Sequence, residues 1–207
     1  KNLGYMYYFG TGVVQDLHHA ADLFRLGAAD DGFRERMLAP ALQRRRATQQ
    51  VSFVYAFCGF DGESYADIPT VKETVGYVPA DSRAARVQET LAISEFAKGL
   101  GVDAVAAHIG FIPEDHSDPL FGEMVETLQG IADYCAGNGQ DFVLETGQES
   151  GERLLAFLKA VDRANLKVNF DPANMILYGS GEPIEAMEIV KDYIVSVHAK
   201  DSTWSDK

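Results

Sequence analysis

Four residues whose side chains can bind metal ions or transfer protons stand at the ends of short apolar runs in this sequence. They are His108, Glu145, Asp171 and His198. Two carboxylates together with imidazole form a mixed set of oxygen and nitrogen donors, which suits Mn²⁺, Mg²⁺, Co²⁺ or Zn²⁺. No cysteine shares the pattern, which disfavours a structural zinc site. The pattern therefore indicates a shared metal or catalytic site, provided that the four side chains meet in space.

Each of these residues also has an ordinary structural explanation. Glu145 could cap the turn that follows it, and Asp171 could begin an Asx-turn. His108 could be a core histidine with satisfied hydrogen bonds, and His198 could pair with Asp201 in a loop. Together, however, these explanations require four independent coincidences at the same end of four apolar runs. The sequence therefore favours the shared site.

The strands and helices that must position these residues are predicted from residue 50 onward. There, short apolar runs alternate with longer amphipathic stretches. The runs predict strands at residues 50–57, 103–109, 142–145, 166–170 and 193–198. The stretches between them predict helices at residues 83–100 (with Asp81 or Ser82 as N-cap), 119–138, 150–161 and 183–190. Repeated strand-then-helix order implies parallel strands joined by crossovers, and continuous apolar runs are typical of strands buried on both faces.

Both a barrel and an open doubly wound sheet fit this order. No GxGxxG motif follows the first strand and no GxxxxGK[ST] motif occurs, so the nucleotide-binding fingerprints of open sheets give that fold no support. The Gly179-Ser180-Gly181 segment is interpreted as a flexible connection rather than a phosphate loop. In a barrel, the carboxyl ends of the strands converge around one mouth, where active sites are built.

Composition excludes several classes of function. The chain has 207 residues and a formal charge of −13, and its one dense basic run is at residues 44–46, so we expect no nucleic-acid partner. It has no long apolar run for a membrane span and no signal-peptide pattern. Cys58 and Cys135 are too few for a disulfide framework, which predicts free buried thiols in a cytoplasmic protein.

Four segments around the candidate site resemble the xylose-isomerase-like barrel superfamily, and more narrowly the bacterial sugar phosphate isomerase/epimerase proteins. They are residues 107–111 (AHIGF), 144–149 (LETGQE), 169–175 (NFDPANM) and 197–201 (VHAKD). The resemblance covers about residues 50–207. It implies an α/β fold, an incomplete (β/α)8 TIM barrel with about five of the eight strands, preceded by a short helical segment.

In that family, one divalent metal ion is held by a Glu, an Asp, a His and a final Glu from four barrel strands. The resemblance implies that Glu145, Asp171 and His198 are the first three ligands, and that the substrate pocket includes His108, Asn174 and Lys200. The fourth ligand, on the last strand, has no recognisable counterpart, and neither do the first, second and eighth strands. We therefore expect weakened metal binding.

The family chemistry implies a metal-dependent sugar or keto-polyol isomerase/epimerase. Glu145 would remove a proton next to a metal-chelated carbonyl, giving an enediolate, while His108 would hold substrate hydroxyls. Lys200 is the one basic residue in the matched segments, which favours an uncharged substrate over a phosphate. The alternatives are an inosose-type dehydratase on the same metal site and a non-catalytic truncated or scaffold fragment. An endonuclease-IV-like phosphodiesterase is disfavoured, because Asn174 stands where that class has a histidine. The enzyme could form a homo-oligomer.

The N-terminal segment shows a second resemblance. Residues 1–32 are similar to one Sel1-like helix–turn–helix repeat, through 3–8 (LGYMYY), 10–13 (GTGV) and the positions Asp16, Ala20, Phe24, Ala28 and Ala29. Such repeats normally need stacked neighbours to bury their apolar face. We predict three parts: the Sel1-like segment at 1–32, a connecting helix or linker at 33–49, and the partial barrel at 50–207.

Overall fold

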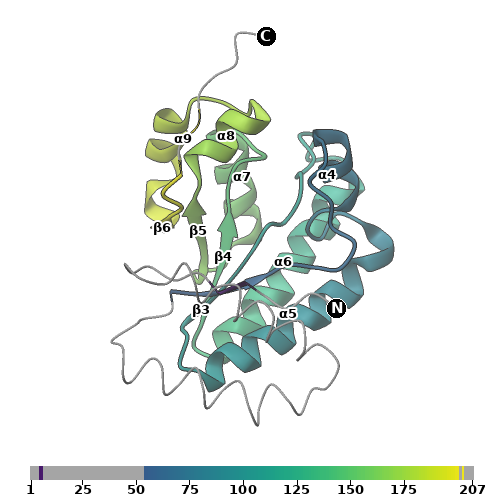
Figure 1. The fold of residues 1–207 in the computed structure, drawn as a ribbon, viewed down its shortest axis with the longest axis vertical. Helices are drawn as coiled ribbons and strands as arrows, with labels where there is room; N and C mark the ends of the chain where they lie inside the picture. The colour runs from purple at the N-terminus through teal and green to yellow at the C-terminus, as the bar shows by residue number, and fades with distance from the viewer. Residues whose placement is uncertain (1–4, 7–53, 201, 203–207) are drawn as a thin grey trace.

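The computed structural model describes residues 5–6, 54–200 and 202, and its centre is a six-stranded sheet in which the spatial order of the strands equals their chain order (Figure 1). The strands are β1 Tyr5–Met6, β2 Ala56–Cys58, β3 Ala104–Ala107, β4 Asp141–Glu145, β5 Leu166–Phe170 and β6 Ile194–Val197. Strands β2 to β6 are parallel, and β1 pairs antiparallel with β2. The five predicted parallel strands are therefore confirmed.

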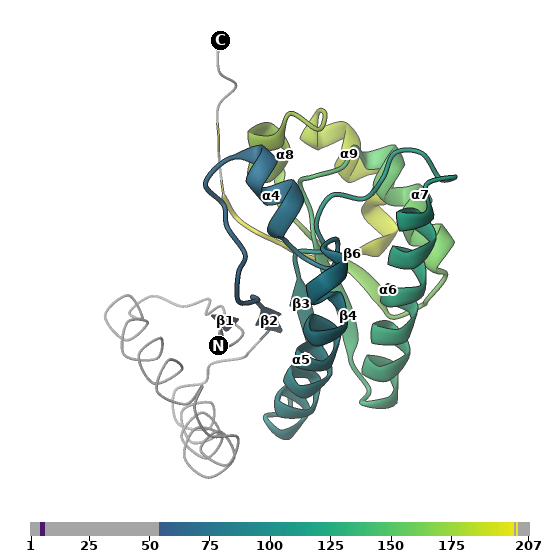
Figure 2. The same cartoon turned by 90° about the vertical axis from the view of Figure 1, so that its right-hand side faces the viewer.

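Helices fill each crossover between the parallel strands. They are α4 Ile68–Thr74, α5 Ala80–Gly99, α6 Pro119–Gly137, α7 Gly151–Val161, α8 Pro172–Tyr178 and α9 Pro183–Val190, with the 3-10 turn η2 Lys191–Tyr193. The long helices α5, α6 and α7 stand side by side along one face of the sheet, and α9 packs against α7 (Figure 2). None of the helices in the described ranges is long and apolar enough to cross a lipid bilayer.

The predicted long helices are confirmed, but two short helices were missed. In α4, only Val71 is buried, so the helix has almost no apolar stripe to detect. The α8 helix begins directly at the end of β5, where Pro172 follows the N-cap residue Asp171. The predicted N-cap of α5 was wrong: Pro79 is the N-cap, and Asp81 lies in the first turn, where its charge favours the helix dipole.

The helical conformation predicted for the N-terminal segment is wrong at the two residues that the structure describes there. Tyr5 and Met6 form β1 rather than a helix, and they pair with Phe57 and Ala56 of β2. The edge of β2 offers unpaired main-chain groups that a short extended segment satisfies. The rest of the predicted Sel1-like segment, the linker at 33–49 and the basic run at 44–46 lie outside the described residues.

The two faces of the sheet bury different sets of side chains. The face under the helices carries the main core, which includes Phe142, Phe157 and Val168. The opposite, inner face carries a small cluster of Tyr55, Phe57, Ala104, Ala106 and Val143. Cys58 and Cys135 are free and buried, as predicted, and burial raises the pKa of the Cys135 thiol to about 11. Alternation along each strand therefore decides whether a side chain stabilises the core or faces the inner side.

A β-bulge between β5 and β6 sets which side chains of β6 face inward. Val168 is paired with Ile194, but Asn169 is paired with Ser196, so Val195 is an extra residue on β6. In a regular register, Val195 would lie beside Asn169 on the inner face, because side chains alternate along a strand. The bulge instead places Ser196 there, and with it His198 two residues later.

The aromatic core under the helices gives a test of the fold. Phe157 of α7 is fully buried, with its ring centroid 5.7 Å from that of Phe121 in α6. We expect Phe157→Ala to lower the free energy of unfolding by about 3–5 kcal/mol, because lost burial and a residual cavity both contribute. Denaturant titration measures this change. The control is Leu177→Ala, at a side chain that is 62% exposed, which should lower the free energy of unfolding by no more than about 0.5 kcal/mol. If both variants lost the same free energy of unfolding, the position of Phe157 in the core would be wrong.

Candidate metal and active site

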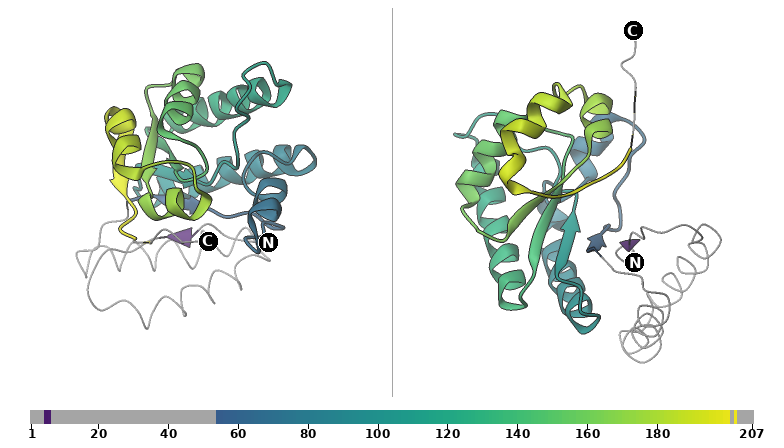
Figure 3. Two further views of the ribbon diagram at one scale, coloured as in Figure 1. Left: turned by 90° about the horizontal axis from the view of Figure 1, so that it is seen from above. Right: turned by 90° about the vertical axis from the view of Figure 1, so that its left-hand side faces the viewer.

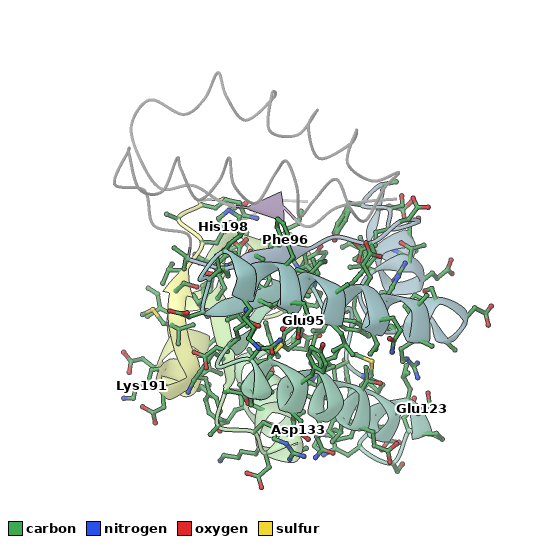
Figure 4. The ribbon with its side chains drawn as sticks, turned by 90° about the horizontal axis from the view of Figure 1, so that it is seen from below. Glu95, Phe96, Glu123, Asp133, Lys191 and His198 are labelled. Atoms are coloured by element: carbon green, nitrogen blue, oxygen red, sulfur yellow. The ribbon has the colours of Figure 1, made fainter. Side chains whose placement is uncertain are left out.

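The ends of three neighbouring strands bring two carboxylates and an imidazole together. Glu145 is the last residue of β4, Asp171 follows β5, and His198 follows β6. One ligand atom from each of the three lies within 4.8 Å of the other two. Figure 4 shows His198 on the side of the sheet away from Glu123 and Asp133 of α6. The site therefore lies on the inner face, at the end of the sheet where α4 and α8 also stand (Figure 3).

His198 joins the two buried carboxylates. Its Nδ1 lies 2.8 Å from Oε1 of Glu145 and 3.1 Å from Oδ2 of Asp171. Asp171 is fully buried and Glu145 nearly so, whereas His198 is partly exposed. Burial raises the pKa of the Glu145 carboxyl; hydrogen bonds from His198 and Asn169 oppose the rise, and the charge of Asp171 adds to it. Two carboxylates so close together in low dielectric need a positive partner.

The two oxygens of Asp171 serve different purposes. Oδ1 accepts a hydrogen bond from the backbone N–H of Asn174, at 2.9 Å, and so caps α8. Oδ2 lies 2.7 Å from Nζ of Lys200 and 3.1 Å from His198 Nδ1, yet it has no partner with hydrogen-bond geometry. The backbone N–H of Asp171 donates to Thr146 Oγ1, which ties β5 to the loop after β4. The Asx-turn explanation is thus correct for one oxygen, and the other remains available as a ligand.

Asn174 and Lys200 meet beside Asp171. Lys200 Nζ donates to Asn174 Oδ1 at 2.7 Å, and Asn174 Nδ2 donates to the backbone carbonyl of Thr146 at 3.2 Å. This approach of α8 requires a glycine at 147, because a Cβ there would lie 2.2 Å from Cβ of Asn174. The backbone of Gly147 also has a positive φ of 142°. Asn174 and Lys200, two of the three residues that the resemblance assigns to the substrate pocket, therefore lie next to Asp171.

His108 directly follows β3, whose last residue Ala107 pairs with Leu144, the residue before Glu145 in β4. Its ring contacts those of Phe57 and Tyr65, at centroid distances of 5.4 and 6.0 Å. Burial lowers the pKa of His108 to about 4, although the negative charge of Asp171 opposes this shift. The imidazole is therefore neutral at pH 7. Its Nδ1 is buried without a hydrogen-bond partner, so the expectation of a satisfied core histidine does not hold.

Buried polar atoms without partners gather at this site. Among the described residues, five buried side-chain atoms lack a hydrogen-bond partner, and four of them belong to His108, Gln148 and Asp171. Both amide atoms of Gln148 are in this group, and its side chain is nearly inaccessible. Such atoms are few in proteins because each costs free energy. Their concentration at the ends of β3, β4 and β5 indicates a site built to hold a polar ligand.

Sequence reasoning missed four polar residues in β5, in β6 and in the loop after β4. They are Gln148, Glu149, Asn169 and Ser196. Burial raises the pKa of the Glu149 carboxyl to about 7, although the backbone N–H of Ile112 donates to it at 3.0 Å. Polar residues inside otherwise apolar strands were the available signal for Asn169 and Ser196. The proposed pairing of His198 with Asp201 concerns a residue outside the described part of the chain.

The three converging residues fit a divalent ion. Ligand atoms that bind one ion at about 2.0–2.2 Å lie roughly 3 Å apart when they are neighbours in its coordination shell. The two separations from His198 Nδ1, 2.8 and 3.1 Å, are of this size. The donor set of two oxygens and one nitrogen suits Mg²⁺, Mn²⁺, Co²⁺ or Zn²⁺. Oδ2 of Asp171, which has ion-pair contacts with Lys200 and His198 but no contact of hydrogen-bond geometry, is the oxygen that such an ion would contact.

Comparison with known proteins adds to this geometry. A family model described as xylose isomerase-like TIM barrel matches residues 18–207. The crystal structure of a xylose isomerase domain protein from Planctomyces limnophilus is 48% identical in sequence, with a TM-score of 0.81. The alignment covers 84% of this chain and 62% of that one, so this chain spans less than two thirds of that protein's length. No protein with a curated function matches the sequence.

Two more distant structures share the fold alone. One is a xylose isomerase-like TIM barrel protein from Mycobacterium smegmatis, solved in complex with magnesium, with 19% sequence identity and a TM-score of 0.53. The alignment covers 60% of this chain and 48% of that one. A D-tagatose 3-epimerase-like protein has 22% identity, a TM-score of 0.63 and coverage of 81% and 63%. With the parallel sheet, these likenesses confirm the predicted fold class, a partial TIM barrel. None of them indicates a Sel1-like repeat, which stays a prediction.

A first prediction from the site concerns Asp171. We expect Asp171→Asn to weaken Mn²⁺ binding by more than about tenfold, or 1.4 kcal/mol, while α8 stays capped, because asparagine is also a good N-cap. Isothermal titration calorimetry measures the affinity. Asp67 caps α4 by accepting from the backbone N–H of Thr70 at 2.8 Å, so Asp67→Asn is the matched control and should bind Mn²⁺ as the wild type does. Equal binding by both variants would argue against Asp171 as a ligand.

A second prediction concerns pH. Burial lowers the pKa of folded His108 from 6.5 to about 4, so between these values the unfolded chain takes up a proton that the folded chain does not. This residue's contribution to stability is therefore lost as the pH falls from 6.5 to 4, by about 3 kcal/mol in total. Denaturant titrations across this range should show a steeper loss for the wild type than for His108→Phe. Parallel curves would contradict the neutral, buried imidazole.

Proposed function

This chain belongs to the xylose isomerase-like TIM-barrel family, and we propose on that premise that it isomerises or epimerises a sugar or keto-polyol with one divalent metal ion. The observation that carries the proposal is the convergence of Glu145, Asp171 and His198 at the carboxyl end of the sheet. Active sites of TIM barrels are built at this end, from residues on different strands. The same barrel fold occurs in a D-tagatose 3-epimerase-like protein and in a protein solved with magnesium, so the proposed chemistry is compatible with the fold.

Glu145, Asp171 and His198 would hold the ion, through Oε1, Oδ2 and Nδ1. A bound divalent ion would polarise a substrate carbonyl and acidify the neighbouring C–H group. Mn²⁺, Mg²⁺, Co²⁺ and Zn²⁺ all suit this donor set. The family's fourth ligand, a glutamate, has no counterpart among the residues that the structure describes.

Glu145 is the proposed catalytic base. Its carboxylate lies between His198 and Asn169, and burial raises its pKa above the ordinary value of a glutamate, which favours proton acceptance. Returning the proton to the adjacent carbon gives isomerisation, and returning it to the opposite face of the same carbon gives epimerisation. His198, 2.8 Å away, fixes which oxygen of Glu145 faces the site.

The neutral polar groups around the base suit hydroxyls. The His108 imidazole, neutral at pH 7, can donate or accept one hydrogen bond, and the unpaired amide of Gln148 can do both. The ammonium of Lys200 is engaged by Asp171 and Asn174, so it is not free to bind a phosphate. We therefore propose an uncharged sugar or keto-polyol as the substrate. An inosose-type dehydratase would begin with the same proton abstraction, and loss of a substrate hydroxyl would identify it.

Hydrogen exchange tests the proposed base. A panel of ketoses incubated in D₂O with the Mn²⁺-loaded protein should gain deuterium next to the carbonyl, as observed by NMR. Glu145→Gln should reduce this exchange by about 10²–10⁴-fold and should weaken Mn²⁺ binding without abolishing it. The matched control is Glu126→Gln, at an exposed carboxylate on α6, which should exchange like the wild type. Unchanged exchange in Glu145→Gln would refute the base, and a metal-loaded wild type inactive on the whole panel would favour the non-catalytic alternative.

A further inference from the structure

A chain of side-chain hydrogen bonds crosses three strands below the candidate metal ligands. Ser196 Oγ donates to Asn169 Oδ1 at 2.6 Å, and Asn169 Nδ2 donates to Glu145 Oε2 in a short contact. The strand register pairs Glu145 with Asn169 and Asn169 with Ser196, so the three side chains form one row on the inner face. Asn169 is 1% exposed, which removes water as an alternative partner.

The direction of this chain is fixed by chemistry. A serine hydroxyl can donate to the amide oxygen of Asn169, but that oxygen cannot donate in return. The NH₂ group of Asn169 must then point at Glu145, whose carboxylate can only accept. Hydrogen bonds to a carboxylate are the stronger kind. Oε2 of Glu145 is thereby occupied, and Oε1 is left facing His198 at 2.8 Å.

We propose that Asn169 and Ser196 are positioning residues that orient the Glu145 carboxylate, so that Oε1 alone is presented to the metal ion and the substrate. This inference rests on the proposed function for the identity of the ion and the reaction. The bulge at Val195 is needed for this chain of hydrogen bonds, because it brings Ser196 opposite Asn169. Partners of this kind fix the orientation and the basicity of a metal ligand.

A purely structural role is the competing explanation, since two buried polar groups could simply satisfy each other. The chain offers a matched control for it in Asn165, which lies just before β5. Its Nδ2 donates to the backbone carbonyls of Ala132 and Gln140, at 2.8 and 3.1 Å, without touching Glu145. Replacing Asn165 should therefore affect stability alone, whereas replacing Asn169 should also affect the metal site.

The test compares Mn²⁺ affinities by calorimetry and thermal stabilities by circular dichroism. We expect Asn169→Leu to raise the dissociation constant about 10–100-fold, and Ser196→Ala to raise it less, because the amide of Asn169 is retained but is free to turn. Ser196→Thr keeps the hydroxyl and should restore the wild-type value. Asn165→Leu should lower the melting temperature and leave the dissociation constant unchanged. If Asn169→Leu does not fold, Ser196→Ala and Ser196→Thr still decide the question.

A double-mutant cycle separates action through Glu145 from a general effect. In a Glu145→Gln background, Asn169→Leu should change the Mn²⁺ affinity far less than in the wild type, because the carboxylate that it orients is gone. Fully additive effects would overturn the positioning role, even if deuterium exchange showed that the proposed function is correct. Mn²⁺ binding with a non-additive cycle but without deuterium exchange would support the positioning role and reject the proposed reaction. A wild type that binds no Mn²⁺ would overturn both.

Discussion

The rest of the site depends on the burial of two carboxylates side by side. Glu145 and Asp171 lose their hydration and repel each other, which would favour protonation of one of them or unfolding. The structure offsets this cost with His198, whose Nδ1 reaches both carboxylates, and with Lys200, whose Nζ lies 2.7 Å from Asp171. A divalent ion bound by Glu145, Asp171 and His198 would add positive charge beside both carboxylates. The neighbouring strands and loops hold Glu145, Asp171, His198 and Lys200 close enough together for this compensation.

The parallel strands place these side chains at one end of the sheet. A glycine and a β-bulge then determine how the side chains are oriented. Crossover helices place the carboxyl ends of β4, β5 and β6 next to one another, so residues far apart in the chain come into contact. Gly147 lets α8 approach the loop after β4, and the bulge at Val195 turns Ser196 and His198 inward. The bulge interrupts the regular pairing of β5 and β6, and Gly147 gives the loop a backbone conformation that other residues rarely adopt. Such features are common beside functional sites, where the orientation of a side chain matters more than the regularity of the ladder.

The buried atoms of His108 and Gln148 that lack hydrogen-bond partners also indicate a functional site, because they lower the stability of the fold. A fold selected for stability alone would pair or remove them, because each buried, unpaired polar atom costs about 1–3 kcal/mol. His108 directly follows β3 and is within reach of the charge of Asp171, and Gln148 lies in the loop that follows Glu145 at the end of β4. Burial also keeps the imidazole neutral, which suits hydrogen bonding to hydroxyls better than to anions. The site therefore combines a strongly charged centre with neutral polar surroundings.

The sequence by itself determined the parallel strands, the long helices and the position of the ligand-type residues at the strand ends, because periodicity and residue type are local properties. It did not reveal α4, in which only Val71 is buried, or α8, which begins directly after β5, or the strand formed by Tyr5 and Met6, which depends on the edge of β2. Only the tertiary structure decided that Asn169 and Ser196 bond to Glu145, and that Lys200 lies against Asp171. These contacts join residues more than 20 positions apart and depend on a one-residue bulge, and a one-residue shift of register moves a side chain to the opposite face.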